Sequence, residues 1–276
     1  MGGGRRLAGN IQINPAENIS LSRALGISPG DIISLVGGGG KSTLMRKLAE
    51  ELAGLGYKVI ATTTTHILPE QTIGWFILEE NQTLLLEKAR KAIRSNPVLT
   101  LASGQEENGK LRGPDPDTIP GFLEFVDFII IEADGAQRKP LKAPNATEPV
   151  IVPRTSIVVA IAGIDGVGKT ARDVVFRVEI AGKLAGFSPD DPVTPKAVSI
   201  LLAHPEGITR TSPPQSRKVA FINKISTEEE NGFAVQIAGL LKEHSSFSRV
   251  IIGNLEGDNP QIQLIQIKNT GIKYGN

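Results

Sequence analysis

Apolar positions follow two different periods along the chain, and the change of period marks where strands give way to helices. Residues 31–36 (DIISLV) form a compact apolar run of the kind that a buried parallel strand shows. Leucines then recur at helical spacing through residues 42–55, with glycines at the end of that stretch. An apolar run at 58–62 completes a strand–loop–helix–strand unit.

The same alternation continues through the rest of the chain. Further strands are predicted at 75–78, 98–102, 128–131, 157–162, 219–222 and 250–252, and a helix at 84–94. Strands that alternate with helices indicate an α/β fold with a mostly parallel sheet and helices on both faces. The stretches 112–121 and 187–195, rich in proline and glycine, are predicted to be surface loops. We expect one domain over residues 20–276, preceded by a loose segment at 1–19.

The strand at 31–36 leads into a glycine-rich loop that favours phosphate binding. Backbone N–H groups in such a loop cradle phosphate oxygens, and the following helix adds the positive end of its dipole. Lys41 is expected to reach the terminal phosphates and Ser42 to ligate Mg²⁺. The loop is shorter than G-x-x-x-x-G-K-[ST], but consecutive glycines can turn tightly. The predicted nucleotide-binding residues are Gly37, Gly38, Gly39, Gly40, Lys41, Ser42 and Thr43.

A second stretch, GIDGVGKT at residues 163–170, meets the full consensus and competes for the nucleotide. Carboxylates decide between the two loops, because a Mg²⁺-nucleotide site needs an acid at the tip of a nearby strand. The strand at 128–131 is followed by Glu132 and Asp134, whereas no acid stands at the tips of the strands after the second loop. We therefore assign the nucleotide to the shorter loop.

Glu132 and Asp134 are two residues apart, so their side chains point to the same side of an extended strand. Both are predicted to hold the metal together with Ser42, and both are candidate catalytic groups together with Lys41. They would lie at the carboxyl end of the sheet, where ligands of open α/β sheets bind. A polar strand end that caps a turn is the alternative.

Hydroxyls and cations near these acids are candidate substrate contacts. Cations in such a place bind an anionic substrate or a transferring phosphate. Each also fits an ordinary role, since threonines extend strands and basic side chains cover surfaces. The candidates are Thr64 and Thr65 after the second strand, Arg138, Lys139 and Lys142 after the acids, and Arg177 beyond the second loop.

Composition narrows the remaining classes of function. Lys+Arg at 30 against Asp+Glu at 29 gives a net charge of +1, which does not favour nucleic acid as a partner. The absence of cysteine excludes disulfides and thiolate nucleophiles, and the cytoplasm is the expected compartment. Apolar runs are far shorter than the ~20 residues that span a bilayer, so no membrane segment is expected. The stretch FINKIS at 221–226 lacks the aspartate with which GTPases recognise guanine, so ATP with Mg²⁺ is the expected cofactor.

Several blocks of sequence resemble a known family, in order along the chain. They are GGGGKSTLMRKLAEEL, VIATTTTHI, IIIEADGAQRKPLKAP, EPVIVP, and GIDGVGKT followed by FRVE and VTPKAVSILLAHPEG. Together they look like the YqeC-type accessory proteins of selenium-dependent molybdenum hydroxylases, and the resemblance implies a P-loop NTPase-like three-layer sandwich. Thr170 stands where that family usually has proline, and Thr147 where a histidine commonly precedes Glu-Pro. The short glycine loop is also similar to that of the Mur-type peptide ligases, which bind ATP.

The resemblance implies a part in supplying selenium to a molybdenum-cofactor enzyme and names no reaction. Because the chain has no cysteine, it cannot carry selenium on its own thiol, so a selenium donor such as selenophosphate would be bound non-covalently or held by a partner. Three classes of function stay open. They are an ATPase or a phosphoryl- or selenium-transferring enzyme, a nucleotide-gated chaperone for the client hydroxylase or its molybdenum cofactor, and a non-catalytic scaffold.

Overall fold

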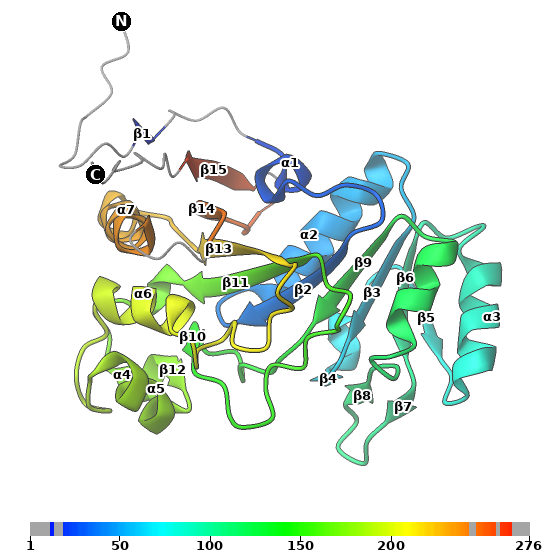
Figure 1. Cartoon of the computed structure of the whole chain (residues 1–276), viewed down its shortest axis with the longest axis horizontal. Coiled ribbons are helices and arrows are strands. Elements are labelled where there is room, and N and C mark those ends of the chain that lie inside the picture. Colours follow the sequence, from blue (N-terminus) through cyan, green and yellow to red (C-terminus); the bar gives the residue numbers. More distant parts are fainter. Residues whose placement is uncertain (1–11, 14–18, 243–246, 258–259, 267–276) are drawn as a thin grey trace, which may run out of the picture.

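The computed structural model describes residues 12–13, 19–242, 247–257 and 260–266, and most of the segment predicted to be loose at 1–19 lies outside these ranges. The centre of the fold is a ten-stranded sheet in the order β1-β15-β14-β13-β11-β2-β9-β3-β6-β5 (Figure 1). The strands from β14 to β5 all run parallel. At the other end, β15 lies antiparallel to β14 and β1 antiparallel to β15. The α/β fold with a mostly parallel sheet is therefore confirmed.

The elements have the following bounds. The strands of the main sheet are β1 (Gln12–Ile13), β2 (Ile32–Gly37), β3 (Val59–Thr63), β5 (Trp75–Leu78), β6 (Val98–Ala102), β9 (Phe128–Glu132), β11 (Ile157–Gly163), β13 (Arg217–Asn223), β14 (Arg249–Asn254) and β15 (Gln261–Gln266). Two small sheets contain β4 (His66–Ile67), β7 (Gly104–Gln105) and β8 (Leu111–Arg112), and β10 (Leu141–Lys142) with β12 (Val175–Phe176). The helices are α1 (Leu21–Leu25), α2 (Lys41–Gly54), α3 (Gln82–Ala92), α4 (Ala171–Val174), α5 (Val178–Ala185), α6 (Pro195–Ala203) and α7 (Glu228–Lys242). Short 3₁₀ turns are η1 (Pro69–Gln71), η2 (Ile119–Glu124) and η3 (Ile164–Gly166).

Helices cover both faces of the sheet because the side chains of each buried strand alternate between the faces. In β2, Ile33 and Leu35 pack in one core cluster with the apolar side chains of α1 and α2. Ile32 and Val36 point to the opposite face, where α3 and η2 cover one half and α6 and α7 the other. This arrangement is the predicted three-layer sandwich, with core on both sides of one sheet.

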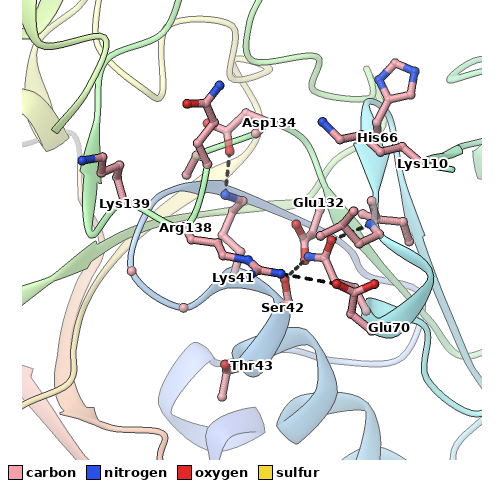
Figure 2. Close-up of a pocket in the computed structure, with 18 of the residues that line it drawn as sticks. Lys41, Ser42, Thr43, His66, Glu70, Lys110, Glu132, Asp134, Arg138 and Lys139 are labelled. Carbon is pink, nitrogen blue, oxygen red and sulfur yellow. Dashed lines mark hydrogen bonds and ion pairs between the residues drawn. The ribbon is translucent and has the colours of Figure 1, made fainter. Parts of the chain in front are cut away.

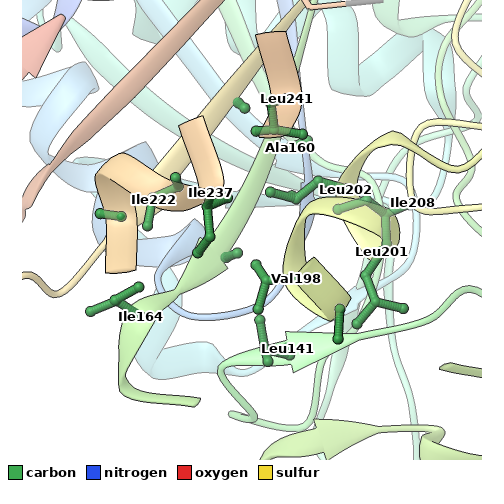
Figure 3. Close-up of a cluster of buried hydrophobic side chains, with 14 of the residues drawn as sticks. Leu141, Ala160, Ile164, Val198, Leu201, Leu202, Ile208, Ile222, Ile237 and Leu241 are labelled. Carbon is green, nitrogen blue, oxygen red and sulfur yellow. The ribbon is translucent and has the colours of Figure 1, made fainter. Parts of the chain in front are cut away.

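The core on the second face is built from small strand residues and larger helix residues. Figure 3 shows Leu202 of α6 and Leu241 of α7 approaching Ala160 of β11. Ala160 is fully buried, and its small side chain lets the two helices pack close to the sheet. β11 is thus packed under α6 and α7 and pairs in parallel with β2.

The order of the strands brings the glycine loop and the predicted acids together. β9 lies between β2 and β3, and its last residue, Glu132, pairs with Leu35 of β2 and Thr63 of β3. Both β2 and β9 end at the same edge of the sheet because they are parallel. The residues that follow these two strands are consequently neighbours, although they are far apart in the chain.

Candidate functional site

The glycine loop after β2 is packed between two backbone segments and bonded to both. The Gly38 amide donates to the Ile161 carbonyl of β11 at 3.0 Å, and the Gly39 amide donates to the Lys139 carbonyl at 3.2 Å. A Cβ on Gly38 would lie 2.6 Å from that Lys139 oxygen. The shape of the loop therefore requires residues without side chains, and contacts with the chain's own backbone hold it.

Replacing Gly39 by alanine is expected to destabilise the fold by about 2 kcal/mol or more. Gly39 has a φ of 78°, and an added Cβ would meet the Gly163 amide nitrogen at 2.3 Å, a backbone atom that cannot rotate away. Urea unfolding measures the change in the free energy of unfolding. Gly54→Ala is the matched control, because Gly54 ends α2 with nothing within 4 Å of an added Cβ, and it should be neutral or stabilising. A Gly39→Ala protein as stable as the Gly54→Ala protein would contradict this reading of the loop.

The first turn of α2 presents unused backbone donors. No side chain caps this helix at Gly40, and the amides of Lys41, Ser42 and Thr43 have no acceptor among the described residues. Such amides, together with the helix dipole, form an anion site. They open into a cavity of about 440 Å³ that Glu132 and Asp134 also line. Figure 2 shows Lys41 at the centre of this cavity, with both acids beside it.

Lys41 is held in the cavity by two acceptors. Its Nζ donates to the Gly37 carbonyl at 2.6 Å and lies 3.2 Å from Oδ1 of Asp134. The residue is 6% exposed, so its charge is little screened by solvent. An anion that enters the cavity would meet an ammonium group already positioned by the loop.

Asp134 holds the start of the glycine loop. Its two carboxylate oxygens accept from the Gly37 amide at 3.2 and 3.0 Å, and they also contact Lys41 and, at 3.0 Å, Nζ of Lys142. Both oxygens are thus occupied by this chain's own donors. Asp134 anchors the loop and Lys41, and as it stands it has little capacity left for a metal ion.

Glu132 is the acid with a free oxygen. It is 6% exposed, and its Oε1 is buried without a hydrogen-bond partner. Burial raises the pKa of its carboxyl group above the ordinary value, against the opposing effects of Lys41 and Ser42, while Asp134 adds to the increase. An unpartnered buried oxygen next to Ser42 is an arrangement that a Mg²⁺ ion would satisfy.

Mg²⁺ bound here would need further ligands from phosphate and water. The described part of the chain contains no group of three or more His, Cys, Asp or Glu side chains that could hold a metal by themselves. Mg²⁺ ordinarily keeps several waters and takes one or two protein oxygens plus phosphate oxygens. Ser42 and Glu132 fit that requirement, and the Ser42 hydroxyl is already oriented by Gln71, whose Nε2 donates to it at 2.5 Å.

The second loop at 163–170 is bonded to the segment at 191–193 and has part of its backbone donors occupied. The Gly168 amide donates to the Val193 carbonyl at 2.8 Å, and Val193 donates back to Lys169 at 2.9 Å. The Ala171 amide, at the start of α4, donates to Asp191 at 2.9 Å. Lys169 is exposed and does not line the cavity. The stretch with the full consensus therefore forms a turn and a β-bridge, its Gly168 amide is already bonded, and it lies outside the cavity lined by Lys41 and the two acids.

The comparisons with known proteins agree with the resemblance seen in the sequence. The family model described as "YqeC protein" matches residues 33–179. The Escherichia coli (strain K12) protein named "Uncharacterized protein YqeC" is 32% identical over 216 residues, which is 77% of this chain and 83% of that relative. The chain belongs to the YqeC family. The family match includes the glycine loop, both acids and the second loop.

The candidate substrate residues of this YqeC-family chain fall into two groups. Arg138 and Lys139 line the cavity, as expected, although Arg138 pairs with Glu70 at 3.3 Å and the Lys139 amine donates to the Asp173 carbonyl. Four others do not line it. They are Thr64, which donates to the Val150 carbonyl at 2.6 Å, Thr65, Lys142 and Arg177.

Lys142 and Arg177 instead belong to a chain of charges behind Asp134 that is fully buried at Asp134 and Lys142 and half-buried at Glu148 and Arg177. Nζ of Lys142 bridges Asp134 at 3.0 Å and Glu148 at 2.7 Å, and its side chain is fully buried. Arg177 lies 2.6 Å from the same Glu148 oxygen. Burial opposes ionisation of Glu148, but the hydrogen bonds from Arg177 and Lys142 outweigh it and lower the pKa of that carboxyl group. The network ties α5 to the glycine loop through Asp134.

Among the cavity residues of the YqeC-family chain that were not predicted from the sequence, three have basic side chains. His66 belongs to β4, Lys110 directly precedes β8 in the same small sheet, and Lys224 follows β13. Figure 2 shows His66 and Lys110 on the side of the cavity away from Lys139. The turn residues Glu107-Asn108-Gly109 predict a hairpin just before Lys110, but they do not show which part of the fold that hairpin lies against.

The stretch FINKIS supports the glycine loop from the neighbouring strand. The Asn223 side-chain amide donates to the Gly39 carbonyl at 2.8 Å, and its Oδ1 accepts from the Leu255 amide at 3.1 Å. Lys224 then pairs with Asp165 at 2.9 Å. Asn223 thus connects the tips of two strands to the loop, a positioning role that does not depend on which base a nucleotide carries.

None of the described helices has the length and apolar content needed to cross a membrane.

Proposed function

We propose that this YqeC-family chain binds ATP with Mg²⁺ at the glycine loop and uses it in the maturation of selenium-dependent molybdenum hydroxylases. One observation carries the proposal. The uncapped start of α2 opens into a cavity beside Lys41, Ser42 and a Glu132 oxygen without a partner. Backbone donors, a cation and a free carboxylate are the groups that a Mg²⁺-bound triphosphate requires. Family membership supports the role in hydroxylase maturation.

Each residue has a distinct part in this proposal. The amides of Lys41, Ser42 and Thr43 bind phosphate oxygens, and the Lys41 ammonium turns from Asp134 toward the terminal phosphate. Ser42 and Glu132 hold the metal, which when bound neutralises phosphate charge and orients the terminal group. Asp134 keeps the Gly37 amide and the loop in position throughout.

The proposed second substrate is an anionic selenium donor such as selenophosphate. Arg138, Lys139 and Lys110 line the same cavity as the glycine loop, and Lys110 has no ion pair or hydrogen bond of its side chain among the described residues. A cation without a partner in a cavity favours an anionic ligand. The chain has no cysteine to carry selenium, which supports a donor bound non-covalently.

A nucleotide-gated chaperone is the second candidate, and the buried network favours it. Asp134 contacts both Lys41 and Lys142, and Lys142 leads through Glu148 to Arg177 at the start of α5. A nucleotide that draws Lys41 away from Asp134 would alter a network that reaches another part of the surface. Transfer of labelled phosphate or selenium to a small molecule favours the enzyme. Hydrolysis stimulated by the client hydroxylase favours the chaperone, and tight binding without any turnover favours a scaffold.

Calorimetric titration of the purified protein with ATP is expected to show saturable binding that Mg²⁺ strengthens. Glu132→Gln should remove most of the increase in ATP affinity that Mg²⁺ causes, a loss of about tenfold. The reason is that an amide oxygen is a weaker Mg²⁺ ligand than a carboxylate. Glu70→Gln is the matched control, since Glu70 lines the same cavity but is exposed and paired with Arg138. Absence of saturable binding of both ATP and selenophosphate in the presence of Mg²⁺ would contradict the proposal.

A further inference from the structure

The last strand of the sheet presents an apolar edge that nothing in the described chain covers. β5 pairs with β6 on one side only, so the backbone groups of its other side have no strand partner among the described residues. Most edge strands are protected by charged side chains, prolines or covering elements. β5 has none of these along its length, because its sequence is Trp-Phe-Ile-Leu.

Exposed apolar side chains are concentrated at this edge. Six large apolar residues are exposed in the described chain, and four of them belong to β5 or the start of α3. These are Trp75 at 57%, Phe76 at 39%, Leu78 at 42% and Leu84 at 45%. Beside them, β5 and α3 enclose a groove of about 530 Å³. A cluster of this kind marks a surface for another protein chain.

The charges around the groove are opposite at its two ends. Glu80 lies just past the carboxyl end of β5 and has no ion pair among the described residues. α3 runs back along β5, because it leads into β6, whose start pairs with the start of β5. Lys91 lines the groove together with Trp75, and Arg94 follows it, so the basic end lies near the start of β5. Neither of these cations has an ion partner in the described residues.

We propose that β5 pairs antiparallel with β5 of a second copy of this chain, about a two-fold axis perpendicular to the sheet. In this antiparallel arrangement, the carboxyl end of β5 in one copy lies beside the start of β5 in the other. Each Glu80 is therefore placed near Lys91 and Arg94 of the other copy. The apolar residues of the two strands meet at the centre. A surface that matches itself in this way is the requirement for an isologous dimer, and it favours a second copy over a foreign partner. The two sheets then form one continuous sheet, and no open edge is left at β5.

Sedimentation analysis of the full chain is expected to give a dimer. Phe76→Lys should raise the dimer dissociation constant by about 100-fold or more, since it sets a charge at the apolar centre of the interface. Phe76 is already partly exposed, so this change should leave the fold intact, which circular dichroism verifies. Ile180→Lys is the matched control. Ile180 is 36% exposed on α5, which lies at the opposite end of the molecule from β5 (Figure 1).

Charge exchange and cross-linking test the orientation of the two chains. Glu80→Lys should weaken the dimer, and adding Lys91→Glu in the same chain should restore it. Because the chain has no cysteine, Phe76→Cys can be joined by a short bis-maleimide, whereas Ile180→Cys should stay uncoupled. Trp75 is the only tryptophan, so its emission should shift to longer wavelength as the dimer is diluted. A monomer at about 100 µM, or a dimer that none of the β5 variants weakens, would overturn the proposal and leave the edge to a foreign partner or to none.

Discussion

Lys41→Ala is expected to weaken ATP binding by about 100-fold, or ~3 kcal/mol, while Lys169→Ala leaves it nearly unchanged. The Lys41 ammonium is 6% exposed, lies in the cavity and is held by Gly37 and Asp134, so it meets a bound phosphate with little solvent screening. Lys169 belongs to the stretch with the full consensus, but it is exposed and does not line the cavity, and the Gly168 amide before it donates to Val193. Titration of both variants with ATP and Mg²⁺ measures the two affinities.

The Lys41 variant needs a folding control, because the lysine also neutralises Asp134. Asp134 keeps Lys142 and the Gly37 amide when Lys41 is removed, so we expect a folded protein whose urea unfolding shows only a moderate loss of stability. Weak binding by a folded Lys41→Ala protein then reports the loss of a phosphate contact. The opposite result, with affinity lost in Lys169→Ala and kept in Lys41→Ala, would move the nucleotide to the second loop.

The main elements of the fold were predictable because long buried strands and amphipathic helices have a clear period. β2, α2 and β9 follow directly from apolar runs and from the change to helical spacing. The two-residue strands β10 and β12 were not predicted, since so short a segment has no period and forms only because two distant parts of the chain meet. The same holds for the small sheet that carries His66 and Lys110 to the cavity.

The position of the site was predictable and the roles of several residues were not. Glu132 and Asp134 could be placed next to the glycine loop because parallel strands end at one edge of a sheet. Sequence spacing does not show, however, that the oxygens of Asp134 are taken by the loop amide and two lysines. The stretch FINKIS does not support guanine recognition and predicts no other role for Asn223, whose hydrogen bond to Gly39 depends on how the strands are ordered.

The orientation of Lys142 is the clearest case in which the chain's tertiary structure decided a role. As a lysine in a loop after the acids, it was expected to face an anionic substrate, but β10 pairs with β12 and turns its side chain inward. There it lies between Asp134 and Glu148 with no solvent exposure. It therefore neutralises one buried carboxylate and one half-buried carboxylate, and removing it should affect stability more than substrate binding.

Lys142→Met is expected to cost about 3–5 kcal/mol of folding free energy, because it leaves the buried Asp134 and the half-buried Glu148 with fewer partners. The double variant, with Lys142→Met and Glu148→Gln in one chain, should lose less folding free energy than the sum of the losses in the two single variants. We expect a coupling energy of about 1 kcal/mol or more. Urea unfolding of the four proteins completes this cycle. Lys88→Met is the matched control, since Lys88 also pairs with a glutamate, Glu79, but is 53% exposed, and its removal should have a much smaller effect.

The pH dependence of stability gives the same network a second test. The pKa of Glu148 in the folded state lies below its ordinary value of 4.5. Its contribution to folding stability is therefore present above about pH 4.5 and is lost as the pH falls through the lowered pKa of the folded state. Glu132, whose pKa is raised, contributes with the opposite sign. Glu148→Gln should therefore flatten the loss of stability on acidification, and Lys142→Met should flatten it in part, because Arg177 still holds Glu148. Two results together would show that these charges are not coupled. They are a loss of stability on acidification that is unchanged in both variants, and a Lys142→Met protein that is as stable as the Lys88→Met protein.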